Sequence, residues 1–344
     1  MNIHAAAAYA AHLLTARSTA GHGVHSPLMY SFITEVIGGR TDAHIMNEIS
    51  NLRREMLSDS RVVRVTDLGA GSSVMQHRER SIRQIARIAA LPAREAALLM
   101  RIAASLDRIM GRVPEQQASG PQAAHRPDDH RVILELGTSL GISTLALALG
   151  APHRRVITVE GCPELAAIAR ENLRRHGADN TEVLNMEFRQ AIAHLKSTGT
   201  KIDMAFIDGN HRGTALIDYT QRITEMGDKM IIVADDIHLN SDMIRAWRSL
   251  CTGQQTPLTA GSTGEQAGQR QASEFVGARS QWAPSEITSG AHSQRTPPEN
   301  VAGEKPPFSS PASDSPVTAS LETLRLGIIF CLHNLTPGHY RIRY

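Results

Sequence analysis

The chain has 344 residues, 41% of them hydrophobic, and its 36 Lys and Arg nearly balance its 34 Asp and Glu. This length supports a sizeable core, and the charge balance excludes a strongly basic protein that attracts polyanions. The three cysteines lie far apart, and no apolar run approaches the ~18 residues of a membrane span. We therefore expect a reduced, cytoplasmic protein with neither a nucleic-acid nor a membrane partner.

The first third of the chain, residues 1–111, is predicted to be mostly helical. Apolar residues recur every three to four positions over 5–16, 28–37 and 81–110. Prolines and the lack of an aliphatic run after Val113 indicate a linker over 112–130. The helical region is expected either to form a substrate lid or simply to pack against the rest of the protein.

Residues 131–252 alternate short β-branched runs with helical patterns. Because each strand is followed by a helix, this order gives βαβ units and a parallel sheet with both faces covered. The pattern predicts a Rossmann-like α/β domain with strands at 131–136, 155–160, 181–186, 202–207 and 230–235.

The remainder of the chain divides into two unlike parts. Segment 253–320 holds eight of the sixteen prolines but only five Ile, Leu or Val residues. It has too little apolar surface to offset the entropy lost on ordering, so we predict a disordered insertion. The runs LGIIFCL and HYRIRY then predict a hairpin within 321–344 that completes the sheet.

A glycine loop follows the first predicted strand of the domain. Gly137 and Gly141 permit a tight turn, and the amides at the helix start favour a polar or anionic group. Glu160 ends the next strand, where a carboxylate can accept hydrogen bonds from both hydroxyls of a ribose. Together these features indicate a cofactor that contains adenosine.

Glu135 precedes this loop and argues against a pyrophosphate there, because a carboxylate repels phosphates. It suits the ammonium group of an amino-acid tail instead. A second glycine run, DLGAGS at 67–72, is not followed by a strand with a terminal acid, and we interpret it as a turn.

Four motifs in order, ELGTSLGISTLALAL, VITVEGCPELAAIARENL, DMAFIDGNHRG and VADDIH, resemble class I S-adenosylmethionine-dependent methyltransferases over about 131–250. HGVHSP, DLGAGS and LRLGIIF further resemble a narrower bacterial group of such enzymes. The resemblance implies a seven-stranded sheet in the order 3-2-1-4-5-7-6 with strand 7 antiparallel, preceded here by the helical extension. It also implies that S-adenosylmethionine is bound by Glu135, Gly137, Thr138, Ser139, Gly141, Ser143, Glu160, Gly161, Glu187 and Asp208, with Glu187 near the adenine.

Asp208 ends the fourth predicted strand, and Asp235 and Asp236 end the fifth. Three carboxylates at one edge repel unless they are protonated or bridged by a cation, and oxygen ligands favour Mg²⁺. The layout resembles metal-dependent O-methyltransferases of the catechol and caffeoyl-coenzyme A type, with Asp-Asp in place of Asp-Asn. The alternative is that these acids cap loops without a metal.

His211 stands three residues after Asp208, where enzymes of this type can carry a general base, and His238 is its rival. The sequence thus predicts methyl transfer from S-adenosylmethionine to a small hydroxylated molecule, assisted by Mg²⁺. Two other classes stay open: an NAD-dependent oxidoreductase that uses the glycine turn and Glu160, and a non-catalytic S-adenosylmethionine-binding protein.

Overall fold

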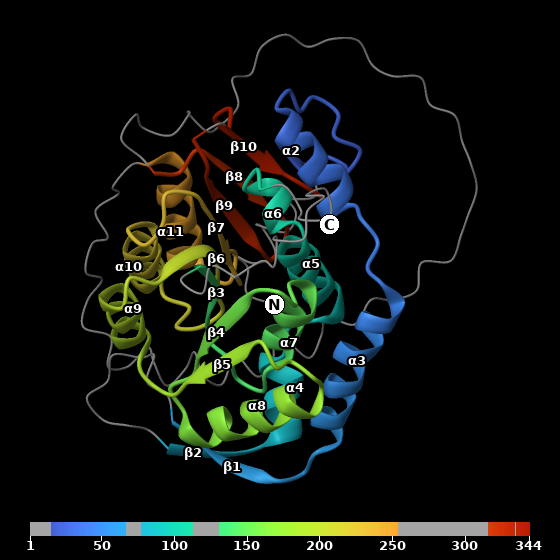
Figure 1. Cartoon of the computed structure of the whole chain (residues 1–344), viewed down its shortest axis with the longest axis vertical. Coiled ribbons are helices and arrows are strands. Elements are labelled where there is room, and N and C mark those ends of the chain that lie inside the picture. The colour runs from blue at the N-terminus through green and yellow to red at the C-terminus, as the bar shows by residue number, and fades with distance from the viewer. Residues whose placement is uncertain (1–14, 67–76, 113–130, 254–315, 334) are drawn as a thin grey trace, which may run out of the picture.

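The computed structural model describes residues 15–66, 77–112, 131–253, 316–333 and 335–344. One large sheet runs through the molecule, with helices on both faces (Figure 1). Its parallel part agrees with the predicted strands to within two residues at either end, which confirms the Rossmann-like α/β fold class. These strands are β3 (Arg131–Leu136), β4 (Arg155–Val159), β5 (Thr181–Leu184), β6 (Lys201–Ile207) and β7 (Met230–Ala234).

The order across the large sheet is β10-β8-β9-β7-β6-β3-β4-β5. Strand β9 (Gly327–Cys331) is antiparallel to both of its neighbours, β7 and β8 (Ala319–Glu322). Strand β10 (Gly338–Arg341) lies parallel to β8 at the edge. The predicted count of seven strands is therefore wrong by one, because β10 extends the sheet.

The predicted C-terminal hairpin is also wrong. Strands β9 and β10 do not pair, because β8 lies between them. The hairpin is formed by β8 and β9, and β8 begins inside the stretch that the sequence assigned to the insertion. Strand β8 forms because its apolar side chains pack against the rest of the protein: Ala319 and Leu321 are fully buried in the core. The rest of the predicted insertion, 254–315, and the linker residues 113–130 lie outside the described residues.

The sheet is buried on both faces, which explains its nearly continuous apolar strands. Successive side chains point to opposite faces, so Ile133 and Leu134 join two different core clusters. The first face is covered by α7 (Ile142–Gly150), α8 (Pro163–Arg175) and the N-terminal helices, and the second by α9 (Phe188–Ser197), α10 (Gly213–Thr224) and α11 (Ser241–Thr252). Within the described ranges, no helix is long and apolar enough to cross a membrane.

The N-terminal region packs on the first face and contributes to its core. Met29 and Phe32 are completely buried there, and the Ser26 hydroxyl caps the first helix. The role as a substrate lid stays a prediction. The elements are α2 (Pro27–Ser31), the π-helix η1 (Phe32–Ile37), α3 (Ala43–Ser58), β1 (Val62–Thr66), β2 (His77–Ser81), α4 (Ile82–Ala89), α5 (Ala93–Ala104) and α6 (Leu106–Ile109).

The predicted helix over 81–110 is divided into α4, α5 and α6. Pro92 stands immediately before α5, where its fixed φ and missing N–H interrupt a continuous helix. The Ser105 hydroxyl donates to the Arg101 and Ile102 carbonyls, which separates α5 from α6. The helical periodicity was correct, but these two residues break the segment.

Candidate functional site

The glycine loop joins the carboxyl end of β3 to the start of α7. Gly137 and Gly141 have φ values of 111° and 82°, which favour glycine. A Cβ on Gly137 would lie 2.3 Å from the Asp208 carbonyl oxygen. Glycine at this position therefore lets the loop after β3 contact the loop after β6, so that the two line one edge of the sheet.

Three residues other than glycine adopt positive φ in the described part of the chain: Ser139, Asn210 and Asp236. They follow β3, β6 and β7, so all three lie at the same carboxyl edge. Strained backbone of this kind costs about 1–3 kcal/mol per residue and concentrates at functional sites. The backbone thus marks the same edge as the predicted site residues.

Glu135 is fully buried in β3, and only one of its two carboxyl oxygens has a hydrogen-bond partner. Its Oε2 accepts hydrogen bonds from the Thr144 and Thr158 hydroxyls, the latter at 2.6 Å, whereas Oε1 has no hydrogen-bond partner. Burial raises the pKa of this carboxyl, and neighbouring hydroxyls offset part of the increase. An unsatisfied buried acceptor costs about 1–3 kcal/mol, so Oε1 is a fitting acceptor for an ammonium group.

Glu160 follows β4 and organises the glycine loop. Its two oxygens accept hydrogen bonds from the backbone amides of Ser139 and Cys162, both at 2.8 Å. The Asn185 side chain holds this turn by donating to the Glu160 and Gly161 carbonyls. Each carboxylate oxygen has a second lone pair, so Glu160 can still accept a hydroxyl hydrogen bond.

The other predicted cofactor residues surround this loop. Thr138 and Ser143 are buried, and the Thr138 hydroxyl lies 2.6 Å from that of Thr158. Glu187 caps α9, with its Oε2 accepting the Gln190 amide at 3.1 Å. Its predicted contact with adenine stays a prediction, since the position of Glu187 is fully explained by the cap.

Asp208, Asp235 and Asp236 are brought together where β6 and β7 end. Asp235 is completely buried, and the side chains of Asp208 and Asp236 are 11% and 13% exposed. Arg325, from the turn between β8 and β9, meets them. Its Nε donates to Asp235 Oδ1 at 2.6 Å and lies 3.4 Å from Asp236 Oδ1, and its Nη2 donates to Asp235 Oδ2.

The side chains of this cluster differ in how readily they carry a charge. Burial raises the pKa of Asp208 well above its usual range, and the neighbouring Asp235 carboxylate raises it further. Burial lowers the pKa of Arg325, but the carboxylates of Asp235 and Asp236 outweigh this and raise it overall. The cluster therefore holds a permanently charged guanidinium beside a carboxyl that resists ionisation.

The predicted magnesium ligands, Asp208, Asp235 and Asp236, have the Arg325 guanidinium as a counter-ion, and their binding of a metal stays a prediction. In the ranges that the structure describes, no group of three or more His, Cys, Asp and Glu side chains could hold a metal. Both oxygens of Asp235 are already engaged by Arg325.

His211 lies beside this cluster. Its Nε2 is 3.8 Å from Asp208 Oδ1. The loop between them is held by Asn210, whose side chain donates to the Tyr219 hydroxyl at 3.0 Å. The rival His238 has its Nδ1 2.9 Å from the Leu324 carbonyl in the turn that carries Arg325, and the choice between the two histidines stays a prediction.

Sequence reasoning missed three kinds of contributor to this edge. Arg325 is 90 residues from Asp235, and no local motif marks it. Thr158 is a buried hydroxyl residue among the apolar residues that follow Arg155 in β4, a signal that could have been noticed. Asn172, buried in α8, donates to the Leu140 carbonyl at 2.9 Å and so holds the glycine loop from a neighbouring helix.

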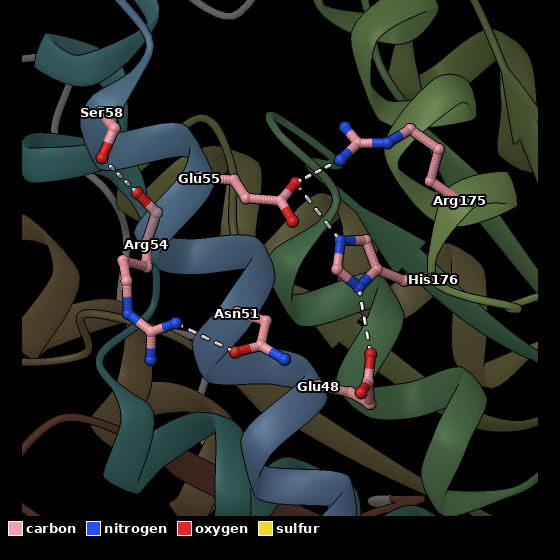
Figure 2. Close-up of a pocket in the computed structure, with 7 residues that line it drawn as sticks. All are labelled: Glu48, Asn51, Arg54, Glu55, Ser58, Arg175 and His176. Atoms are coloured by element: carbon pink, nitrogen blue, oxygen red, sulfur yellow. Dashed lines mark hydrogen bonds and ion pairs between the residues drawn. The ribbon is translucent and has the colours of Figure 1, made fainter.

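A separate pocket of about 540 Å³ lies between α3 and the end of α8 (Figure 2). Its lining contains two close pairs, Arg175 with Glu55 at 2.6 Å and His176 with Glu48 at 3.3 Å, and Arg54 donates to the Asn51 side chain. It contains none of the predicted site residues, and its lining consists of Glu48, Asn51, Arg54, Glu55, Ser58, Arg175 and His176.

Comparisons with known proteins agree with the geometry at the sheet edge. Residues 134–237 match the family model described as a methyltransferase domain. Over these residues the chain is therefore similar to a methyltransferase domain. The chain is also 38% identical over 152 residues to the catechol O-methyltransferase of Mycobacterium tuberculosis. That similarity covers 43% of this chain and 63% of the relative, so the chain spans less than two thirds of the relative's length.

Two solved structures are similar to the chain at low TM-scores. A cofactor-bound protein from MTB is 22% identical, with coverage of 63% of this chain and 80% of its own, and a TM-score of 0.39. The O-methyltransferase from Bacillus cereus in complex with SAH is 15% identical, with coverage of 73% and 84% and a TM-score of 0.36. Both similarities are too distant to add to the argument on activity.

Proposed function

We propose that this protein is a class I S-adenosylmethionine-dependent methyltransferase that transfers the methyl group to a hydroxyl oxygen of a small molecule. The observation that carries the proposal is the buried Oε1 of Glu135, which lacks a donor beside a glycine loop in a methyltransferase domain. An ammonium group would satisfy it. NAD offers pyrophosphate at this position instead, which Glu135 would repel.

Different residues along the edge of the sheet would bind different parts of S-adenosylmethionine. Glu135 would receive the ammonium group, the backbone between Gly137 and Gly141 would lie against the methionyl part, and Glu160 would accept from the ribose. Glu187 at the start of α9 is the candidate for adenine. The cofactor supplies the methyl group, and the chain supplies alignment, which can account for much of the rate enhancement.

His211 is the proposed general base. An acceptor hydroxyl must lose its proton as its oxygen is methylated, and a neutral imidazole can take that proton. We assign the proton to Nε2, the nitrogen that faces Asp208. The proposal places the acceptor between His211 and the glycine loop.

A small acceptor is favoured over a nucleic acid. The net charge of +2 gives no extended positive surface for a polyanion. The relative of similar sequence is named a catechol O-methyltransferase, which supports an oxygen acceptor on a small molecule. Cytoplasmic location stays part of this proposal.

Calorimetric titration tests the cofactor assignment. The wild type should bind S-adenosylmethionine and S-adenosylhomocysteine but not NAD. Glu135→Gln should weaken both affinities about 10-fold to 100-fold, since a hydrogen bond to a charged group contributes about 1.5–3 kcal/mol. Glu182→Gln, at an exposed carboxylate of β5 paired with Arg155, is the matched control and should bind normally.

Folded wild-type protein that releases no heat with either sulfur compound would refute the proposal. Binding of NAD in their place would support the oxidoreductase. Cofactor binding with no methyl transfer to a panel of catechols, phenols and aliphatic alcohols would support the non-catalytic alternative.

A further inference from the structure

The acidic edge of the site carries its own cation. Asp208, Asp235 and Asp236 converge with little exposure to water, where like charges repel strongly. Arg325 contacts Asp235 through two hydrogen bonds and approaches Asp236, and its charge also acts on Asp208. The guanidinium thus occupies the position that a bridging cation would need.

The turn that presents Arg325 is anchored on several sides. The Thr323 amide donates to the Leu326 carbonyl at 2.9 Å, and the Thr323 hydroxyl accepts the Leu326 amide at 3.0 Å. The Ile237 amide donates to the Arg325 carbonyl at 3.2 Å, which ties the turn to the segment after Asp236. His238 contacts the adjacent Leu324 carbonyl. This anchoring means that Arg325 is held in place before any ligand arrives.

The contact geometry favours arginine over a divalent ion. A guanidinium fork matches the two oxygens of a carboxylate, and Arg325 uses this match on Asp235. Mg²⁺ requires an octahedron of oxygens at about 2.0–2.1 Å. A metal could therefore use Asp235 only if Arg325 were displaced from its anchored turn.

We propose that Arg325 is a positioning residue that takes the place of a divalent cation, so that methyl transfer by this protein does not require a metal. The inference rests on the proposed function. Since no metal then has to bind two oxygens at once, the acceptor needs one hydroxyl rather than two neighbouring ones. Arg325 keeps the acidic edge compact around that hydroxyl by neutralising Asp235 and Asp236.

The test compares the full-length wild type with Arg325→Ala and Arg325→Lys. Mn²⁺ binding is measured by electron paramagnetic resonance, and Tm is measured with Mn²⁺ and with EDTA. Arg245→Ala is the matched control, because Arg245 is an exposed arginine that pairs with Asp242 within one helix. Titration with S-adenosylhomocysteine shows separately whether the cofactor half of the site is intact.

We expect the wild type to show no Mn²⁺ binding and no change of Tm with EDTA. Arg325→Ala should have a lower Tm, bind Mn²⁺ with an affinity at least about tenfold above the detection limit that the wild type does not reach, and recover Tm when Mn²⁺ is added, because metal binding stabilises the folded state. Arg325→Lys should restore part of the Tm and prevent the gain of metal binding. A simple packing role for Arg325 would lower Tm without creating a metal site.

Methyl transfer by the wild type should persist after exhaustive chelation. Loss of transfer in EDTA with recovery in Mg²⁺, or Mn²⁺ binding by the wild type, would overturn the inference even if Arg325→Ala fails to fold. Failure to bind S-adenosylhomocysteine would instead refute the proposed function, so the two outcomes are distinguishable.

Discussion

The two ends of β6 bury aspartates in opposite electrostatic settings. At the amino end, burial raises the pKa of Asp203, but hydrogen bonds from Arg112 and Arg154 lower it overall, and Arg131 also donates at 3.0 Å. At the carboxyl end, Asp208 lies close to Asp235, Asp236 and Arg325, and its pKa is raised by burial and by the neighbouring Asp235 carboxylate. At the amino end, an excess of arginines surrounds one aspartate and stabilises the fold. At the carboxyl end, three aspartates lie close together at the proposed methyl-transfer site.

Local backbone geometry contributes to this difference. Asp203 is the extra residue of a bulge, since Val132 pairs with Ile202 and Ile133 pairs with Met204. Its completely buried carboxylate meets arginines from separate segments. The negative charge of Asp203 is therefore fully compensated at this end. Unbalanced charge and strained backbone at the other end are typical of functional sites.

Replacing Asp203, whose charge is neutralised by arginines, should have the largest effect on stability. Asp203→Ala removes one of the two carboxylates that pair with the buried Arg154, the other being that of Asp107, and breaking a buried pair costs about 3–5 kcal/mol. Urea unfolding measures the loss. Asp179→Ala, at an exposed aspartate, should change the free energy of unfolding by no more than about 0.5 kcal/mol. A loss below about 1 kcal/mol for Asp203→Ala would show that this end is not the stabilising one.

Replacing the proposed base should instead affect turnover alone. His211→Ala is expected to lower kcat about 100-fold or more, the usual contribution of general base catalysis, with little change in Tm or cofactor affinity. His153→Ala is the control, because His153 pairs with Asp107 in the arginine network at the amino end. Unchanged kcat in His211→Ala would remove His211 from the mechanism.

The stability contributions of Asp203 and Asp208 should change with pH in opposite directions. In the folded protein the pKa of Asp208 is raised above 3.8, the ordinary value of an aspartate. The contribution of Asp208 to the free energy of unfolding is therefore complete below about pH 3.8 and is lost as the pH rises toward the raised pKa. Asp208→Asn mimics the protonated form, so it should match the wild type near pH 4 and exceed it by about 1 kcal/mol at pH 7.

Asp203→Asn should behave in the reverse manner. Its lowered pKa gives stability that is present above about pH 3.8 and lost as pH falls, so the deficit of this variant should shrink in acid. Urea unfolding across pH 3 to 8 measures both variants. Parallel pH profiles would contradict the electrostatic difference between the two ends.

The smallest effect is expected for one arginine of the amino-end network. Arg131→Gln should cost less than about 1 kcal/mol, because Arg131 is partly exposed and Asp203 keeps Arg112 and Arg154. Thermal unfolding measures it. A loss as large as that of Asp203→Ala would show that the three arginines act as one unit rather than as redundant partners.

Sequence reasoning succeeded where the determinants are local. The five parallel strands, their helices and the glycine loop were correctly located because each βαβ unit has its own periodicity and turn residues. It placed Glu135 and Glu160 at one edge because parallel strands end on the same side. It could not assign Glu160 its bonds to the Ser139 and Cys162 amides, which depend on the exact path of the loop.

Patterns within short segments were enough to predict the α/β class, the similarity to methyltransferases and the acids at the strand ends. Two features depended instead on packing between distant segments: β8 separates β9 from β10, and the turn after β8 delivers Arg325 to Asp235. Strand pairing and ion pairing between distant segments are set by burial and charge in three dimensions. No periodicity along the chain records which buried carboxylate a distant arginine will neutralise.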